Sequence, residues 1–296
     1  MEDTISDKEA AAMHDPRVPE TLEGWSVLHQ MYRVRWSEWR ALTASDRETR
    51  ATETAQSLIA MQQGKEGTSV PVTMLGHKGD LLLIHFRRDF QALQAAQLEV
   101  ARFGLAPFLE PTTSFVSVVE LGLYEMTGRI HGRLAGQGLK AGSEEFETAF
   151  DAEMKEQEKR VAGRLWLEVP PRRHVCFYPM NKRRGEAKNW YAEPFDVRAR
   201  MMLEHGKIGR RYTGQVTQII SGAIGFDDWE WGVDLFADDP LVFKKLIYEL
   251  RFDTATVWYG EFGPFYVGLQ FSPSELPKYL EGEVPAFHGP EKRLVE

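Results

Sequence analysis

The sequence predicts an α+β protein in which two similar halves form a dimeric-type α+β barrel. Three observations predict this fold. The chain has 296 residues, enough for two compact units. Strand-like apolar runs and helical stretches follow one another in the same order twice, as expected for duplicated ferredoxin-like βαββαβ halves. The segments IHFRRDFQAL and LEVARFG of the first half also match VDLFADDPLV and LIYELRFD of the second.

The first half covers residues 21–131. One of its helices has Leu93, Ala96, Val100 and Phe103 on one face. Apolar runs bounded by polar residues predict its strands. The expected elements, in order, are a strand from Trp25 to Arg33, a polar helical stretch from Ser37 to Gln63, a strand from Asp80 to Phe86, the helix just described, and a strand from Ser114 to Leu121.

The second half covers residues 174–296 and repeats this order. Gly206 follows a helical stretch and predicts its end in a left-handed cap, because glycine tolerates positive φ. The expected elements are a strand from His174 to Tyr178, a helix from Phe195 to His205, strands from Thr213 to Gly222 and from Glu230 to Phe236 around a turn at residues 225–228, a helix from Pro240 to Arg251 with Phe243, Leu246, Ile247 and Leu250 on one face, and a strand from Gly263 to Phe271.

Two segments lie outside these halves. Residues 1–20 form a polar, acidic N-terminal extension, for which the sequence suggests no function. Residues 132–173 are rich in glycine and alanine at first, continue as a charged helical run from Ser143 to Ala162, and end with Pro170 and Pro171. We expect this second segment to be a surface connector between the halves.

Composition argues against several classes of protein. The net charge of −8 argues against general nucleic-acid binding, which normally needs an excess of Lys and Arg. No apolar run approaches the roughly 20 residues of a membrane span. The N-terminal residues lack the basic and apolar regions of a secretory signal, so we expect a cytoplasmic protein. The single cysteine, Cys176, lies in an apolar run and is expected to be a buried core residue.

One short segment concentrates groups that can carry chemistry. The sequence YPMNKRR, residues 178–184, places a phenol and three cations directly after the apolar run Val175-Cys176-Phe177. Taken alone, a tyrosine at a strand end usually serves packing, and a short basic run is usually a solvated loop. His205 has no second His or Cys at zinc-site spacing. A single axial histidine is sufficient for haem iron.

Four motifs resemble the coproheme decarboxylases of the chlorite dismutase superfamily: YPMNKRR, NWY at residues 189–191, the run from MMLEHGKIGRRYTGQ to LIYELRFD, and YGEFGPFYVG. The resemblance extends from Thr21 to Gly268. It implies that His205 is the proximal iron ligand, that Tyr178 is the oxidisable catalytic residue, and that Lys182 lies near a reacting propionate. It implies further cofactor contacts by Arg210, Gln218, Arg251, Thr256, Met180 and Trp229. Serine is common among the relatives where this chain has Thr256.

The resemblance also implies a reaction. Hydrogen peroxide would drive oxidative decarboxylation of propionates 2 and 4 of iron coproporphyrin III (coproheme) to vinyl groups, which makes coproheme both substrate and redox cofactor and haem b the product. The family is typically pentameric, so a homo-oligomer is expected, with ferrochelatase as a transient partner. Three alternatives stay open: a chlorite dismutase or weak haem peroxidase, a non-catalytic haem-binding module, and a structural or interaction protein. Gln218 argues against the first, because chlorite-decomposing relatives carry arginine there.

Overall fold

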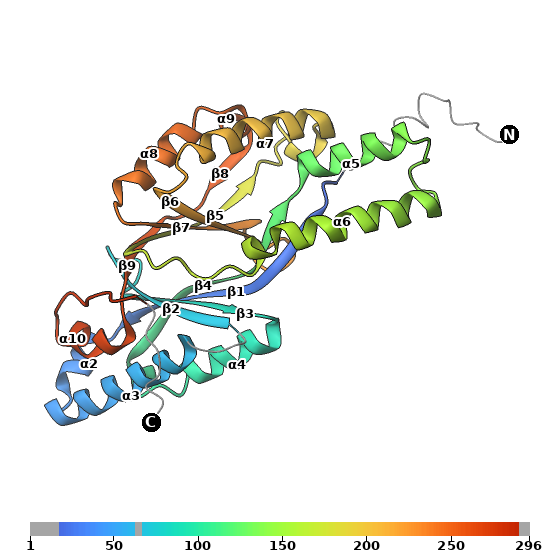
Figure 1. The fold of residues 1–296 in the computed structure, drawn as a ribbon. Helices are drawn as coiled ribbons and strands as arrows, with labels where there is room; N and C mark the ends of the chain where they lie inside the picture. Colours follow the sequence, from blue (N-terminus) through green and yellow to red (C-terminus); the bar gives the residue numbers. More distant parts are fainter. Residues whose placement is uncertain (1–17, 63–66, 290–296) are drawn as a thin grey trace.

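The computed structural model of the protein describes residues 18–62 and 67–289, so most of the predicted N-terminal extension lies outside the described residues. The strands are β1 (Thr21–Val34), β2 (Gly67–Met74), β3 (Leu81–Arg87), β4 (Leu109–Gly122), β5 (His174–Lys182), β6 (Val216–Gly222), β7 (Trp231–Ala237), β8 (Gly260–Phe262) and β9 (Tyr266–Gln270). The α-helices are α2 (Trp36–Ala41), α3 (Ala44–Gln62), α4 (Phe90–Val100), α5 (Tyr124–Gly136), α6 (Glu144–Leu165), α7 (Phe195–Arg210), α8 (Leu241–Leu250), α9 (Thr254–Tyr259) and α10 (Leu276–Leu280) (Figure 1). Short 3-10 turns are η1 (Ala106–Phe108), η2 (Trp190–Ala192) and η3 (Pro273–Glu275).

The described strands form one antiparallel sheet that closes into a barrel. The strand order is β7-β6-β4-β1-β3-β2-β9-β5-β8, and the ring closes because β5 also pairs with β7. Along its other edge, β5 pairs first with β9, through His174 to Phe177, and then with β8, through Met180 to Lys182. The predicted α+β barrel is therefore confirmed.

The barrel interior is filled by side chains from strands around the whole ring. Because successive side chains of a strand point to opposite faces, every second residue of each strand lies inside. A polar pair crosses this apolar interior: His29 of β1 lies 2.9 Å from the Asp234 carboxylate of β7. The buried interior residues are Val27, Met31, Val70, Val72, Met74, Leu82, Ile84, Phe86, Phe115, Val119, Val175, Phe177, Ile219, Ala223 and Phe236.

Helices cover the outside of the barrel on two opposite sides (Figure 1). On one side α3 and α4 pack against the first-half strands, and the predicted apolar face of α4 is buried. On the other side α7 and α8 pack against β5, β6 and β7, and the predicted face of α8 is likewise buried. The two helices begin differently. Asp89 is the N-cap of α4 and accepts a hydrogen bond from the Ala92 N–H, whereas the N-cap of α8 is Pro240 and Asp239 just before it accepts a hydrogen bond from the Leu241 N–H.

The end of the described chain completes the core of the first half. Phe271, Leu276 and Leu280 are buried among residues of α2, α3 and α4. The Trp39 Nε1–H donates a hydrogen bond of 3.2 Å to the Leu280 carbonyl oxygen. No described helix is long and apolar enough to cross a membrane.

The structure corrects the prediction for Gly206. The helix does not end there: α7 continues to Arg210, and Gly206 is not among the described glycines with positive φ. Glycine within a helix costs only about 1 kcal/mol relative to alanine. Burial of Ile208, two residues further on, favours continuation of the helix because it packs in the cluster beneath α8.

Five helices and strands were absent from the prediction: β2, β8, α5, α9 and α10. Pro71 interrupts the strand pattern of β2, although this strand lies inside the sheet. Helix α5 was not predicted because its sequence is rich in glycine, and α9 was not predicted because it is only six residues long. Helix α5 also runs across residue 131, the expected limit of the first half.

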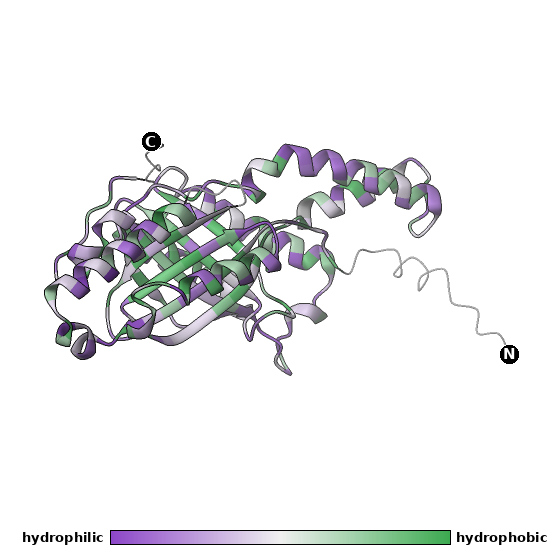
Figure 2. Ribbon diagram, turned by 90° about the horizontal axis from the view of Figure 1, so that it is seen from below, coloured by the Kyte–Doolittle hydropathy of each residue, from purple (hydrophilic) through white to green (hydrophobic). Residues whose placement is uncertain are grey.

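Helices α5 and α6 form a hairpin that projects from the barrel (Figure 1). The predicted charged helix corresponds to α6, and Ser143 caps it by accepting a hydrogen bond from the Phe146 N–H. The hairpin has a small apolar cluster of its own, formed by Ile130, Leu134, Phe146 and Phe150. Polar residues dominate the rest of the α6 surface, whereas apolar residues concentrate in the barrel (Figure 2).

Candidate functional site

Four of the nine residues predicted to act lie on one face of the barrel, the outer face of β5, β6 and β7 under α7 and α8. Strand alternation explains the placement. In β5, Phe177 points into the barrel, whereas Tyr178 and Met180 pack in the outer cluster with Val233 and Leu235 of β7. Lys182 continues the outward series, and Gln218 lies on the same face because Ile219 points inward. We call this the β5 face.

Tyr178 lies in the interior of a strand and not at its end, because β5 extends to Lys182. It is 2% exposed, and its ring centroid lies 4.7 Å from that of Phe265 and 5.6 Å from that of Phe262. Burial, and to a lesser extent Cys176, raises the pKa of the phenol far above its usual value. Tyr178 is therefore a neutral phenol shielded from water. Its oxidation to a neutral radical must be coupled to loss of the phenolic proton.

Lys182 is a buried cation, with 7% of its surface exposed. Its Nζ lies 4.6 Å from the ring centroid of Trp190, on the 3-10 turn η2. Burial lowers the pKa of this ammonium to about 8, although Asp253 and Glu230 oppose the shift. Below that pH the group is charged in a place where water is scarce, which favours an anionic ligand.

His205, on α7, is held by a carboxylate. Its Nδ1 lies 3.0 Å from Oδ2 of Asp253, whose side chain is fully buried. The Thr256 hydroxyl donates to the same Oδ2 at 2.9 Å, and the Thr256 N–H donates to Oδ1 at 2.9 Å, so Asp253 is also the N-cap of α9. Burial alone would raise the pKa of Asp253, but the hydrogen bonds and charge of His205, with the Thr256 bonds, lower it overall.

This arrangement suits a histidine that binds a metal. Metal-binding histidines usually give their second ring N–H to a carboxylate or carbonyl, which fixes the ring and its tautomer. With Nδ1 bound to Asp253, Nε2 is the nitrogen left for a metal ion. Within residues 18–62 and 67–289 no cluster of three or more His, Cys, Asp or Glu side chains is arranged to hold a metal. The donor set therefore fits a single axial histidine, with a macrocycle supplying the other ligands.

The remaining predicted residues lie at the edge of this face or apart from it. Arg251, at the end of α8, has its guanidinium 5.0 Å from the ring centroid of Phe262, which also contacts Tyr178. Arg210 is exposed in the last turn of α7, beside Gly206. Gln218 is exposed on β6. Trp229 does not join the cluster of Tyr178, because it packs against the barrel-interior residues.

Sequence reasoning missed Asp253 and the contact between Lys182 and Trp190. Asp253 three residues before Thr256 is a recognisable N-cap pattern, but nothing in the sequence links it to His205, 48 residues earlier. Cys176 is buried as predicted, and burial raises the pKa of its thiol to about 12.

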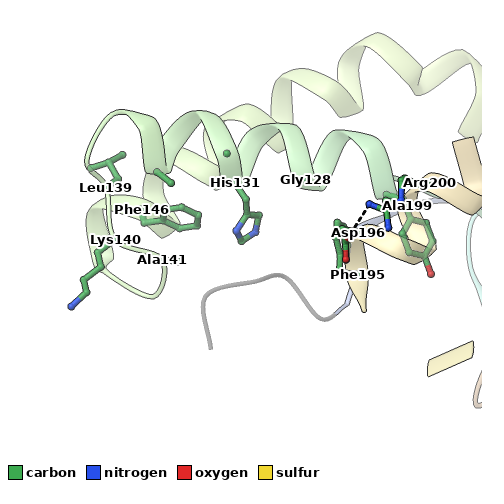
Figure 3. A pocket seen from close by; sticks show the side chains of 13 residues that line it. Gly128, His131, Leu139, Lys140, Ala141, Phe146, Phe195, Asp196, Ala199 and Arg200 are labelled. Atoms are coloured by element: carbon green, nitrogen blue, oxygen red, sulfur yellow. Dashed lines mark hydrogen bonds and ion pairs between the residues drawn. The ribbon is translucent and has the colours of Figure 1, made fainter. Parts of the chain in front are cut away.

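An open cavity of about 640 Å³ lies elsewhere, between α5, α6 and α7 (Figure 3). His131 points into it between the aromatic side chains of Phe146 and Phe195, and Asp196 at its edge is ion-paired with Arg200 at 2.7 Å. None of the predicted site residues lines this cavity. We place the candidate site at the β5 face, because the buried phenol of Tyr178 and the buried ammonium of Lys182 lie there and not in this cavity.

The chain is similar to known proteins in both sequence and structure. A family model described as chlorite dismutase matches residues 47–271. The chain is 41% identical over 256 residues to the coproheme decarboxylase of Staphylococcus saprophyticus, and the match covers 86% of this chain and 94% of that protein. It is 42% identical over 269 residues to a protein of Natronomonas pharaonis whose name proposes heme binding. That match covers 90% of this chain but only 42% of the archaeal protein, so the chain spans less than half of this relative.

Solved structures share the fold. A heme-binding protein from Thermus thermophilus superposes with a TM-score of 0.76 at 38% identity, over 90% of this chain and 99% of that chain. A mutant chlorite dismutase from Candidatus Nitrospira defluvii superposes with a TM-score of 0.65 at 17% identity, over 88% and 96% of the two chains. The second likeness concerns the fold alone.

Proposed function

Because this chain belongs to the chlorite dismutase family, we propose that it binds coproheme and converts it to haem b with hydrogen peroxide. In each of two rounds a propionate, one H2O2 and one proton give a vinyl group, CO2 and two H2O. The proposal is carried by one observation: the buried phenol of Tyr178 and the buried ammonium of Lys182 share one face of β5, and the Asp253 carboxylate that holds His205 also acts on the charge of Lys182.

The chemistry of the β5 face supports a porphyrin with several carboxylates. Apolar side chains of β5, β7 and α8 surround Tyr178, as a macrocycle requires. Lys182, Arg210 and Arg251 supply cations for carboxylates. His205 would hold the iron through Nε2, and the bound iron would supply the reactivity towards peroxide.

The proposed roles of the side chains follow from their surroundings. Tyr178 gives up its phenolic hydrogen and, as a neutral radical, takes a hydrogen atom from the β-carbon of a propionate. Its burial supports this role, since water is kept from the radical and the ionised phenolate is disfavoured. Lys182 neutralises the carboxylate that is lost as CO2. Asp253 keeps the His205 ring in one orientation.

Chlorite decomposition has weaker support. An uncharged amide at Gln218 can donate a hydrogen bond to a ligand but cannot offset an anionic charge. The structural likeness to a chlorite dismutase, at 17% identity, concerns the fold alone.

The test is to add ferric coproporphyrin III and then hydrogen peroxide to the purified chain and to follow the products by mass. We expect a three-propionate intermediate followed by haem b. Tyr178→Phe keeps the packing but lacks the O–H, so it should bind coproheme and form neither product. Coproheme bound without any product in the native chain would identify a haem-binding module. Conversion by the phenylalanine variant at the native rate would remove Tyr178 from the reaction.

A further inference from the structure

The NWY motif, residues 189–191, folds back on the end of β5. The Trp190 N–H donates to the Arg183 carbonyl oxygen at 2.9 Å, and the Gly185 N–H donates to the Lys188 carbonyl oxygen at 3.0 Å. The turn η2 is thus attached to the residue that directly follows Lys182. The Asn189 side chain stiffens the turn by accepting a hydrogen bond from the Tyr191 N–H.

The Trp190 ring lies against the Lys182 ammonium and is itself held on two sides. Trp190 is 2% exposed. Its Nε1–H donates to the Tyr124 hydroxyl of α5 at 3.3 Å, and its ring meets that of Tyr259 edge-on at 5.3 Å. The Tyr259 hydroxyl in turn donates to Glu193. The indole ring is therefore held in place by neighbours from two helices, and its face is presented to Lys182.

The backbone of Lys182 is fixed as well. Its N–H donates to Oε2 of the buried Glu230 at 2.7 Å, and Arg184 lies 3.6 Å from Oε1 of the same carboxylate. Glu230 is anchored through its own N–H, which donates to the Asn181 side chain. The lysine is thus fixed at its backbone by Glu230, and the ring face of Trp190 meets it at the end of its side chain.

We propose that Trp190 is a positioning residue for Lys182, whose ring face holds the buried ammonium at the point where a substrate carboxylate binds. The identity of that carboxylate rests on the proposed function, whereas the contact does not. The face of an indole attracts a cation, and the attraction grows when water is excluded, as it is here. Because the ring cannot turn away, the ammonium stays in one place before any ligand arrives.

The electrostatic surroundings of Lys182 predict the direction of the effect. Burial favours the neutral amine, while Asp253 and Glu230 favour the ammonium. The ring face of Trp190, like these two carboxylates, favours the ammonium. Its removal should therefore lower the pKa of Lys182, so that the lysine loses its charge at a lower pH.

The test is a pH titration of ¹³C-labelled lysine side chains by NMR in the ligand-free protein, with Lys182 assigned by the signal lost in Lys182→Gln. In Trp190→Leu we expect the pKa of Lys182 to fall by about one unit. Trp190→Phe, which keeps a weaker ring face, should give a smaller decrease. Trp258→Leu is a matched control, because Lys188 lies 4.7 Å from that ring but Trp258 is 47% exposed. It should leave the pKa of Lys182 unchanged.

Two results would overturn the proposal: an unchanged pKa in Trp190→Leu, or equal decreases in the leucine and phenylalanine variants. If the leucine variant does not fold, the phenylalanine variant decides, and an unchanged pKa there refutes the role. A coproheme titration adds a second measurement, with binding several-fold weaker in Trp190→Leu and largely restored in Trp190→Phe. Since the NMR titration needs no turnover, a lowered pKa without any haem b would support the positioning role and reject the proposed reaction.

Discussion

At the hydrogen bond between Asp253 and His205, the effect of a substitution on ligand binding can be separated from its effect on folding. Asp253 accepts from His205 Nδ1 at 3.0 Å and caps α9 through the Thr256 N–H at 2.9 Å. Asparagine keeps an oxygen that can cap the helix, since Asn and Asp are similar N-caps. It cannot keep the negative charge that faces the imidazole. Asp253→Asn therefore removes the charge and leaves most of the cap.

The expected magnitude follows from these contacts. Loss of the carboxylate partner of a metal-binding histidine typically weakens metal affinity by about 10- to 100-fold. We expect Asp253→Asn to weaken the binding of ferric coproporphyrin III by a factor in that range, measured by absorbance titration of the Soret band. The free energy of unfolding should change little at the cap itself. Asp253→Ala should lose about 1 kcal/mol more of stability in urea unfolding, because the cap is then lost as well.

The pH dependence has a defined sign. The pKa of Asp253 is lowered below its ordinary value of 3.8 in the folded protein, so its contribution to stability is present above that pH. It is lost as the pH falls through the lowered pKa. Asp253→Asn should therefore remove part of the acid sensitivity of unfolding. If the variant binds coproheme as tightly as the native chain and shows the same acid unfolding, Asp253 does not orient His205 and the metal-site reasoning is wrong.

Three further predictions concern the β5 face and its surroundings. His205→Ala should abolish the axial iron bond, seen as a changed ferric spectrum, while coproheme still docks through its carboxylates; an unchanged spectrum would exclude His205. Gln218→Arg should increase the affinity of the coproheme complex for anions such as cyanide at neutral pH, because it adds a positive charge. Equal anion affinities would mean that residue 218 does not face the ligand. Because burial lowers the pKa of Lys182 to about 8, coproheme binding should weaken as the pH rises through that value. Lys182→Gln should remove this step, and a step that survives the substitution belongs to another group.

The sequence was sufficient for the fold because apolar periodicity and the repeated order of elements are local patterns. The buried faces of α4 and α8 could be predicted from residues within a few positions of one another. The continuation of α7 past Gly206 could not be predicted in this way, because burial of Ile208 under α8 outweighs the preference of glycine for the end of a helix. Likewise, Pro71 weakened a strand pattern that pairing with β3 and β9 overrides.

Some residues of the candidate site could likewise be predicted from the sequence, and others could not. Tyr178 and Lys182 share a strand face because they are four residues apart in β5, whereas the sequence predicted a strand that ends at Tyr178. The resemblance to a known family supplied the role of His205. The partners that tune these groups, Asp253 and Trp190, come from other elements, and no local pattern connects them with the residues that they contact. Their side-chain contacts became visible only in the folded chain.

Closure of the barrel has a consequence for synthesis of the protein on the ribosome. The hydrogen-bond partner of Trp39 lies 241 residues further along the chain, so it is synthesised much later. Likewise, β2 pairs with β9 only when Gly268 to Gln270 have emerged. At about 5 to 20 residues per second, that interval lasts roughly 12 to 48 s. Throughout it, the apolar surface that Phe271, Leu276 and Leu280 later cover is open to solvent or to a chaperone. The nascent first half is therefore an incomplete folding unit until the residues of β9 and α10 have emerged.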